Sequence, residues 1–334
     1  MYKFNHTQYN KIDFDFVSLK DFSLDSLEGI EANTSFLNLQ NSFENRFSFS
    51  KTKTFSFSKE GFLALFIELR QNYKDTKIAV CESESEALIE AYKIYKELGF
   101  EIKLIPLNKD GSVNKNEIKE AEIDFLFISS YVMDTFYITD LKEIKTLTNA
   151  KIVSNASADF SNYSDAVYFD NYKLSGYSLN AVLLFNDNLF LENSLGFIDT
   201  ISMKICYEAI NKQTFNNSLK DVFLEKLIEK FKDDIYFFVD NSKTLPFTLH
   251  IALKNIKARE LIRTLVFDNI YLSNGEGCSL GLSKPSRIIQ AMGYDETTSR
   301  NALSFSFKED LTIEEINKII NKIYTKYLQI KIMN

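Results

Sequence analysis

The most distinctive reactive side chain in this sequence is the thiol of Cys278. It lies in the stretch SNGEGCSLGLSKPSR, residues 273–287, which holds three of the ten glycines of the chain. Glycine raises the entropic cost of ordering a helix or strand, whereas a loop that bends sharply benefits from it. The composition therefore predicts a loop that presents a thiol, whose thiolate form is the nucleophile. A lone cysteine is also typical of a small buried core residue, so the stretch alone leaves both interpretations open.

The scarcity of histidine and cysteine excludes several classes of site. The chain has two histidines and three cysteines, and no cysteine pair has the spacing of zinc ligands. Neither a common metal site nor a disulfide framework is therefore expected. Ser-His-Asp and Cys-His catalysis are disfavoured for the same reason, and we expect His250, in an apolar strand, to be a core residue. Chemistry must come from lysine, cysteine and carboxylates, or from a bound cofactor.

The composition is typical of a soluble globular protein. The hydrophobic fraction is 45%, the charged fraction is 25% and the net charge is −7, which gives no reason to expect a nucleic-acid partner. No apolar run approaches the roughly 20 residues that cross a bilayer. The first residues lack the apolar core of a signal peptide. We therefore expect a reduced, cytoplasmic protein that does not associate with membranes.

The elements that position the reactive groups follow from hydrophobic periodicity. From about residue 60 amphipathic helices alternate with short apolar strands, which predicts a mainly parallel sheet covered by helices. Two more strands, 165–169 and 180–185, lie about ten residues apart, too close for a helical crossover. The expected helices are 60–72, 84–98, 114–121 and 140–148, and the expected strands are 77–81, 100–105, 123–129 and 151–154.

The last third of the chain differs in composition and predicts a second domain. With 334 residues, the chain is long enough for two domains. We expect a large α/β domain over residues 20–215 and a smaller α+β domain over residues 216–334. Residues 1–19 are expected to belong to the smaller domain. The expected elements of this part are helices at 199–212, 218–232, 257–266 and 312–329 and a strand at 246–253.

A second residue of chemical interest is Lys173, in a polar turn that precedes Gly176 and joins the strands 165–169 and 180–185. A lysine considered alone is most often a solvated charge. A lysine amine that is partly desolvated has a lowered pKa and becomes a nucleophile and a proton carrier. The residues around Lys173 do not by themselves decide between these two roles.

The motifs that follow Cys278 occur in a recognisable order. They are Pro-Ser at 285–286, Ala-Met-Gly at 291–293 and Phe-Ser at 305–306. With them the sequence resembles the class V aminotransferase family, and within it the cysteine desulfurases, which use pyridoxal 5'-phosphate (PLP). The segment LGFEIKLIPLNKDGSV at 98–113 also resembles that family.

The resemblance implies a fold, a cofactor and a reaction. The fold is that of the fold-type I PLP-dependent transferases, and the expected assembly is a homodimer. Lys173 corresponds to the lysine that forms a Schiff base with PLP, whose ring withdraws electrons from the bound amino acid. Cys278 corresponds to the cysteine that attacks the sulfur of L-cysteine. The expected products are alanine and a persulfide on Cys278, which passes sulfur to an acceptor protein.

The same resemblance assigns further contacts, several with altered residue types. Asn155 replaces an aspartate at the cofactor ring nitrogen, and Ser85 replaces a histidine on the ring. Ser56 and Ser58 remain as donors in a reduced phosphate loop, and Arg300 is the candidate for the substrate carboxylate. The other departures from the family pattern are Tyr172 for a histidine, Asp170 for a serine, Met133 for an asparagine, Ser304 for an arginine and Gly196-Phe197 for Gly-Thr.

Three functions remain open from the sequence. The first is a PLP-dependent cysteine desulfurase that uses Lys173 and Cys278. The second is a catalytically impaired or PLP-free paralogue that acts as a binding or regulatory protein, which explains the altered pocket residues with one cause. The third is an aminotransferase or lyase acting on another amino acid, in which Cys278 is incidental. We favour the first, because the lysine and the cysteine are both present.

Overall fold

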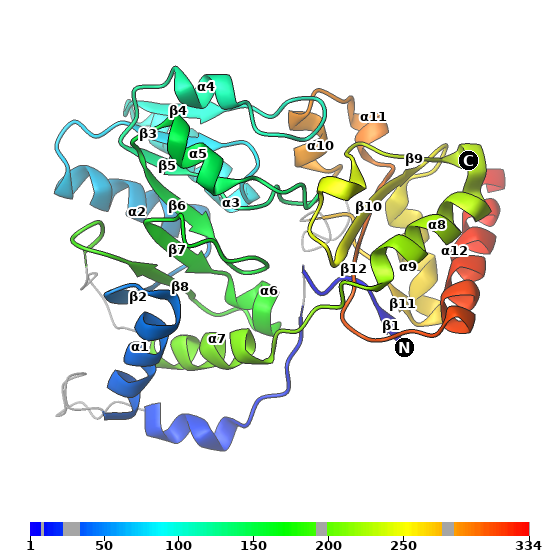
Figure 1. Ribbon diagram of the computed structural model, residues 1–334, viewed down its shortest axis with the longest axis horizontal. Helices are drawn as coiled ribbons and strands as arrows, with labels where there is room; N and C mark the ends of the chain where they lie inside the picture. The colour runs from blue at the N-terminus through cyan, green and yellow to red at the C-terminus, as the bar shows by residue number, and fades with distance from the viewer. Residues whose placement is uncertain (8–9, 23–33, 192–198, 276–283, 334) are drawn as a thin grey trace.

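The structure is a computed structural model that describes residues 1–7, 10–22, 34–191, 199–275 and 284–333. Figure 1 shows a large domain built around one sheet and a smaller domain beside it. Cys278 lies outside the described residues.

A seven-stranded sheet forms the centre of the large domain, with the strand order β2-β8-β7-β6-β5-β3-β4. Neighbouring strands from β7 to β4 are parallel, and β8 runs antiparallel to both β7 and β2. The mainly parallel α/β sheet that the sequence predicts is therefore confirmed. The strands are β2 (Lys51–Phe55), β3 (Ile78–Cys81), β4 (Ile102–Ile105), β5 (Phe125–Phe127), β6 (Lys151–Asn155), β7 (Ala166–Phe169) and β8 (Ala181–Phe185).

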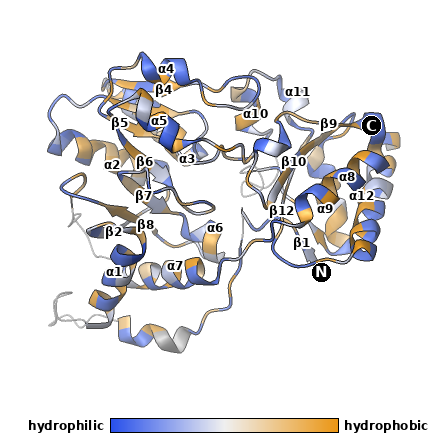
Figure 2. Ribbon diagram, in the orientation of Figure 1, coloured by the Kyte–Doolittle hydropathy of each residue, from blue (hydrophilic) through white to orange (hydrophobic). Residues whose placement is uncertain are grey.

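Helices cover both faces of this sheet because successive strand residues point to opposite sides. In β3, Ile78 and Val80 pack in the core formed with α2 and α3, whereas Ala79 and Cys81 pack in the core formed with α4 and α5. Figure 2 shows the sheet strands as largely hydrophobic. The helices of this domain are α1 (Thr34–Phe47), α2 (Lys59–Asn72), α3 (Glu86–Glu97), α4 (Lys115–Lys119), α5 (Leu141–Leu147), α6 (Asn171–Ser175) and α7 (Thr200–Lys212).

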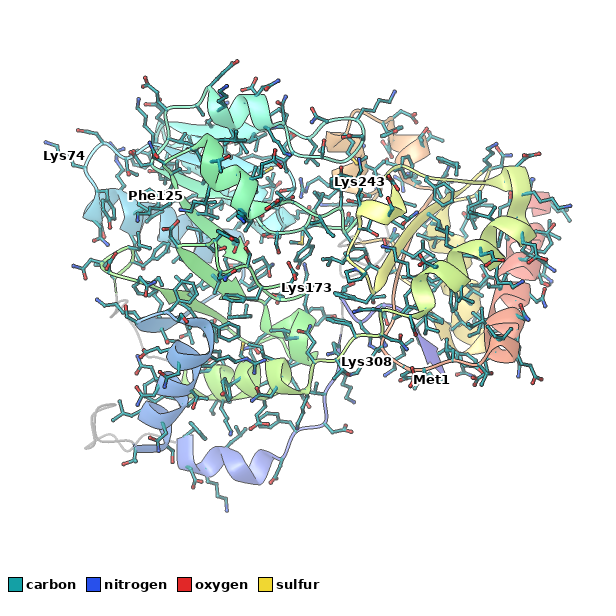
Figure 3. All side chains as sticks on the ribbon, viewed as in Figure 1. Met1, Lys74, Phe125, Lys173, Lys243 and Lys308 are labelled. Atoms are coloured by element: carbon teal, nitrogen blue, oxygen red, sulfur yellow. The ribbon has the colours of Figure 1, made fainter. Side chains whose placement is uncertain are left out.

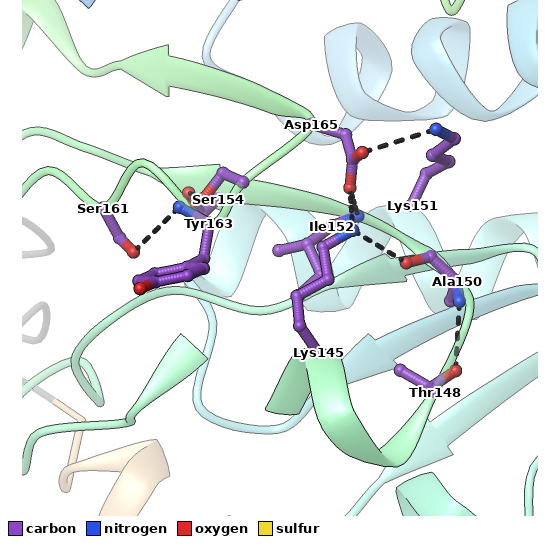
Figure 4. A network of polar contacts seen from close by, with 10 residues as sticks. Lys145, Thr148, Ala150, Lys151, Ile152, Ser154, Ser161, Tyr163 and Asp165 are labelled. Atoms are coloured by element: carbon purple, nitrogen blue, oxygen red, sulfur yellow. Dashed lines mark hydrogen bonds and ion pairs between the residues drawn. The ribbon is translucent and has the colours of Figure 1, made fainter. Parts of the chain in front are cut away.

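The start of β6 is fixed by a polar network around Asp165, drawn in Figure 4. The Asp165 carboxylate accepts a hydrogen bond from the Ile152 backbone N–H at 2.7 Å and pairs with the ammonium groups of Lys145 and Lys151. These contacts hold the N-terminal end of the strand whose other end carries Asn155. The network is therefore structural and lies away from the candidate site residues.

The small domain has a three-stranded antiparallel sheet in the order β12-β10-β9. Its apolar core lies between this sheet and the helices α8, α9 and α12. The elements of this domain are α8 (Leu219–Phe231), β9 (Ile235–Tyr236), β10 (Thr248–Leu253), α9 (Ala258–Leu265), β11 (Ile270–Tyr271), α10 (Arg287–Ala291), α11 (Glu296–Ser299), β12 (Ala302–Ser306) and α12 (Ile313–Met333).

The N-terminal segment contacts both domains. Its first strand, β1 (Tyr2–Lys3), pairs in parallel with β11 of the small domain. Farther along, the backbone N–H of Asn10 donates to the carbonyl oxygen of Lys173 at 3.0 Å. The segment therefore connects the small domain to α6 of the large one.

Candidate functional site

A cavity with a volume of about 890 Å³ is lined in part by Lys173. Its walls include residues at the N-terminal ends of four helices, α2, α3, α6 and α7. Backbone N–H groups at a helix N-terminus carry partial positive charge and attract anions. The cavity therefore combines a lysine amine with several positions suited to negative charge.

Lys173 is placed in this wall by the short helix α6. Asp170 begins the helix, because its carboxylate accepts from the backbone N–H of Tyr172 at 3.0 Å and of Lys173 at 3.5 Å. Gly176 ends it in the left-handed conformation, with φ at 80°. The sequence analysis predicted a polar turn here, but the two capping residues close one helical turn instead.

The side chain of Lys173 is 7% exposed, and its Nζ lies 3.5 Å from the sulfur of Met133. Figure 3 labels Lys173 on the side of the large domain that faces the small domain. A largely desolvated lysine amine at a cavity wall has the placement that imine formation with a carbonyl compound requires. The position of Lys173 is the feature of the site best suited to covalent chemistry.

Ser56 and Ser58 lie at the N-terminal end of α2, in the same cavity wall. Ser58 caps the helix by accepting from the backbone N–H of Gly61 at 3.2 Å, and the Ser56 hydroxyl donates to that of Ser58 at 3.1 Å. Gly61 is required here because a Cβ atom at this position would lie 1.9 Å from the Ser56 carbonyl oxygen. The sequence thus maintains a tight helix start that offers hydroxyl groups to the cavity.

Carboxylates outnumber ammonium groups around this cavity. Among the described residues that line it, two are lysines, Lys59 and Lys173, and five carry carboxylates. Hydrogen bonds from its own backbone N–H and from the Ser58 hydroxyl hold the pKa of Glu60 below its usual range. An anionic ligand would therefore meet negative charge at the start of both α2 and α6. The five carboxylates belong to Glu60, Glu86, Glu90, Asp170 and Asp199.

Asn155 and Ser85 are buried close to strand ends but do not line the cavity. Ser85 caps α3 by accepting from the backbone N–H of Leu88 at 3.4 Å. The Asn155 side-chain oxygen accepts from the backbone N–H of Ser157 at 2.9 Å, while its amide nitrogen has no partner among the described residues. A buried donor without an acceptor is costly, so Asn155 has the capacity to donate to a ligand.

Arg300 is separated from these residues. It ends the short helix α11, and its guanidinium pairs with the Glu296 carboxylate at 2.6 Å. Ser304, which replaces the arginine of the family pattern, donates to the backbone oxygen of Asp134 at 2.9 Å. The structure therefore brings Lys173, Ser56 and Ser58 to one cavity and does not bring Arg300 to it.

The two cysteines within the described residues are both buried. Cys81 and Cys206 have no exposed surface, and burial raises the pKa of the Cys81 thiol to about 12 and that of Cys206 well above its usual range. Neither forms a disulfide bond. A buried thiol with a raised pKa is a poor nucleophile, so neither competes with Cys278 for a reactive role.

The sequence analysis identified Asp170 as a departure from the family pattern but missed the other carboxylates of the cavity wall. Asp170 and Asp199 each precede a helix and cap it, with the Asp199 carboxylate accepting from the backbone N–H of Ser202 at 2.9 Å. An aspartate before an amphipathic segment is a recognisable helix-start signal. That signal identifies the caps, but it does not reveal that several of them converge on one cavity.

Comparison with known proteins supports a relationship to cysteine desulfurases. No family model matches the chain. The sequence is 21% identical over 294 residues to the cysteine desulfurase IscS of Dictyoglomus turgidum, which covers 75% of this chain and 74% of that protein. It is 20% identical over 287 residues to the IscS of Colwellia psychrerythraea, covering 75% and 70%. A shorter match to a Nostoc cysteine desulfurase is 30% identical over 112 residues, 34% of this chain and 27% of that protein.

Solved structures show the same relationship at the level of the fold. A NifS-like protein superposes with a TM-score of 0.80 at 15% identity, covering 98% of this chain and 99% of that one. A NifS-like protein from Rickettsia africae gives a TM-score of 0.72 at 17% identity, with coverage of 98% and 99%. The chain therefore has the NifS-like fold, and the predicted resemblance to the class V aminotransferases is confirmed. Among the described residues, no helix has the length and apolar character to span a membrane.

Proposed function

We propose that this protein is a cysteine desulfurase-like enzyme that holds PLP on Lys173 and receives sulfur from L-cysteine on Cys278. The observation that carries the proposal is the buried Lys173 amine at the wall of a cavity of about 890 Å³. Sequence similarity to cysteine desulfurases over three quarters of the chain supports it. We further propose that the protein acts as a homodimer and delivers its sulfur to an acceptor protein.

The residues present suit the reactive end of PLP better than its phosphate. Lys173 offers the amine for the aldehyde, and the amide nitrogen of Asn155, which has no partner among the described residues but does not line the cavity, would donate to the ring nitrogen if the bound ring reached it. Ser56 and Ser58 offer hydroxyl groups to the phosphate, but the carboxylates of Glu60 and Asp170 oppose it. We therefore expect the cofactor to bind with weakened phosphate anchoring.

When bound, PLP would supply an electron sink for the amino-acid substrate. An amide donates to a neutral ring nitrogen, whereas an aspartate stabilises a protonated one, so Asn155 makes that sink weaker. Lys173, once its amine is released, is the base that carries a proton to and from the substrate Cα. Its amine lies at the cavity wall, where a bound substrate can reach it.

The thiolate of Cys278 acts on the sulfur of the bound cysteine. It attacks Sγ, forming an S–S bond while the Cβ–Sγ bond breaks and its electron pair remains on the carbon side. Cβ then takes one proton, so L-cysteine and the thiolate become L-alanine and a persulfide on Cys278. Sulfur is oxidised as the carbon is reduced, and no external oxidant is needed. For Arg300 to bind the substrate carboxylate, its ion pair with Glu296 must first break.

The second candidate is a PLP-free paralogue that uses the fold for binding. The excess of carboxylates around the cavity favours it, because a phosphate dianion would be repelled there. The third candidate, an aminotransferase or lyase, predicts turnover that does not depend on Cys278. The three functions predict different products when L-cysteine is incubated with the protein and PLP.

The experiment is to incubate the protein with PLP and L-cysteine and to measure both alanine and the mass of the Cys278 peptide. The desulfurase predicts alanine and a mass increase of one sulfur atom on Cys278, both lost in Cys278→Ala and in Lys173→Ala. Turnover that survives in Cys278→Ala would favour the aminotransferase or lyase. Wild-type protein that forms neither product and gives no visible absorption band with PLP would favour the PLP-free paralogue, whereas a band without either product would favour an enzyme that acts on another amino acid.

A further inference from the structure

The chain segments on either side of the loop that contains Cys278 both contact Asp134. The first contact involves Gly275, which has a φ of +91°. A Cβ atom at Gly275 would lie 2.1 Å from both Cγ and Oδ1 of Asp134. Only glycine therefore lets the backbone at this point lie against the Asp134 carboxylate.

The second contact involves Ser286, on the C-terminal side of the loop. Its hydroxyl donates to Oδ2 of Asp134 at 2.8 Å and caps α10 by accepting from the backbone N–H of Ile289. The neighbouring Lys284 pairs with Glu86 at 2.9 Å. This flank is thereby attached to the large domain next to the cavity that Glu86 lines.

Asp134 itself is held close to Lys173. It is 2% exposed and adopts a φ of +63°, an uncommon conformation for a residue other than glycine. Its backbone oxygen accepts from the Ser304 hydroxyl, and the preceding residue, Met133, contacts the Lys173 amine. A buried carboxylate is retained only when hydrogen bonds offset its desolvation, and strained conformations of this kind concentrate at functional sites.

From these contacts we propose that Asp134 is a positioning residue that fixes both flanks of the Cys278 loop relative to Lys173. This inference rests on the proposed function and adds a positioning residue to it. Asp134 sets the approach of the Cys278 thiolate to a substrate bound at Lys173. Because a displacement of about 1 Å can slow a positioned reaction about a hundredfold, losing the anchor should slow sulfur transfer by that order.

The anchoring is measured by hydrogen–deuterium exchange on peptides that cover 270–275 and 284–292. Asp134→Ala should speed exchange in both peptides and leave the core strands β3 and β6 unchanged. Asp134→Asn keeps an oxygen that accepts from Ser286 and should restore slow exchange. Ser286→Ala removes its hydrogen bond to Asp134 and its cap on α10 but leaves the contact at Gly275, so it should affect the C-terminal peptide alone.

Glycine variants give a matched pair. Gly275→Ala forces the Asp134 carboxylate away, whereas Gly293→Ala has the same backbone cost, with φ at +89°, but nothing lies within 4 Å of the added methyl group. Only Gly275→Ala should speed exchange in both peptides. Equal behaviour of the two alanine variants would overturn the contact with Asp134 as the cause.

Loss of the Asp134 side chain should slow sulfur transfer without changing the binding of L-cysteine or PLP. In Asp134→Ala, the rate of persulfide formation on Cys278 should fall about a hundredfold, while the KM for L-cysteine and the visible absorption of added PLP stay as in the wild type. Wild-type exchange and wild-type transfer in Asp134→Ala would overturn the proposal, as would loss of PLP absorption in this variant. If the wild type forms no persulfide, the proposed function fails, while the exchange data still decide whether Asp134 anchors the loop.

Discussion

The side-chain nitrogen of Lys173 lies 3.5 Å from the sulfur of Met133. A thioether is only a weak hydrogen-bond acceptor and donates nothing. The family that the sequence resembles has an asparagine at this position, beside the phenolic oxygen of the cofactor. The contact therefore places an apolar side chain where a donor is expected.

Met133→Asn should tighten PLP binding. The new amide offers a hydrogen bond worth about 1 kcal/mol, which corresponds to roughly a fivefold lower Kd. The measurement is a titration of PLP followed by absorbance, with Met133→Leu as the apolar control. An unchanged Kd in Met133→Asn, or a tighter one in Met133→Leu, would count against this placement of the cofactor.

Removing the negative charge that caps α6 should also tighten PLP binding. Asp170→Asn retains the N-cap, because asparagine caps helices as well as aspartate does, but it removes one carboxylate from the cavity wall. We expect PLP to bind several-fold more tightly and inorganic phosphate to compete more strongly. Asp140→Asn, which makes the same change at the cap of α5 outside this cavity, should have no effect. Equal effects of the two changes would exclude a local electrostatic cause.

Thiol alkylation should distinguish the three cysteines. In the folded protein near neutral pH, iodoacetamide should label Cys278, while Cys81 and Cys206 remain unlabelled because they are buried and have raised pKa values. In urea all three should react. Mass spectrometry of the cysteine peptides gives the rates, and native labelling of Cys81 or Cys206 at the rate of Cys278 would refute the expectation.

The protein should lose stability as the pH falls from 6.5 towards 4.5. Burial lowers the pKa of His250 to about 3, and neither of its ring nitrogens has a hydrogen-bond partner among the described residues. Burial also lowers the pKa of His6 to about 4. Below pH 6.5 the unfolded chain binds protons that the folded chain does not, so each histidine contributes up to about 1.4 kcal/mol of destabilisation per pH unit.

His250→Leu should reduce that pH dependence without loss of stability at pH 7.5. The side chain is fully buried beside Phe238, so an apolar residue suits the site. The measurement is the free energy of urea unfolding at several pH values, with His6→Gln as the second histidine variant. A pH dependence that is the same in His250→Leu as in the wild type would show that folding does not lower the pKa of His250.

Much of the fold could be predicted from the sequence because its determinants are local. Each predicted strand of the central sheet has its apolar run, and β7 and β8 are antiparallel because the connection is too short for a crossover. The sequence also carries the caps of α6, Asp170 and Gly176, which were interpreted as a polar turn because the helix has only five residues.

The features that local patterns miss depend on distant contacts. Ser286 and Asp134 are 152 positions apart, and nothing in either segment indicates their hydrogen bond. Likewise, four helix starts that meet at one cavity give no joint signal in the sequence. Arg300 was chosen as the candidate carboxylate ligand because it is close in sequence to Ser304, where the family has an arginine. In the structure, the geometry of α11 places Arg300 against Glu296 instead.

The most direct measurement of the central claim is whether PLP attaches to Lys173. The purified protein is titrated with PLP, the visible absorption is recorded, and the adduct is reduced with borohydride and located by peptide mass spectrometry. The account predicts a visible band and a reduced adduct on Lys173, absent in Lys173→Ala and retained in Lys59→Ala, which removes the other lysine among the described cavity-lining residues. No band at saturating PLP, or an adduct that persists in Lys173→Ala, would contradict it.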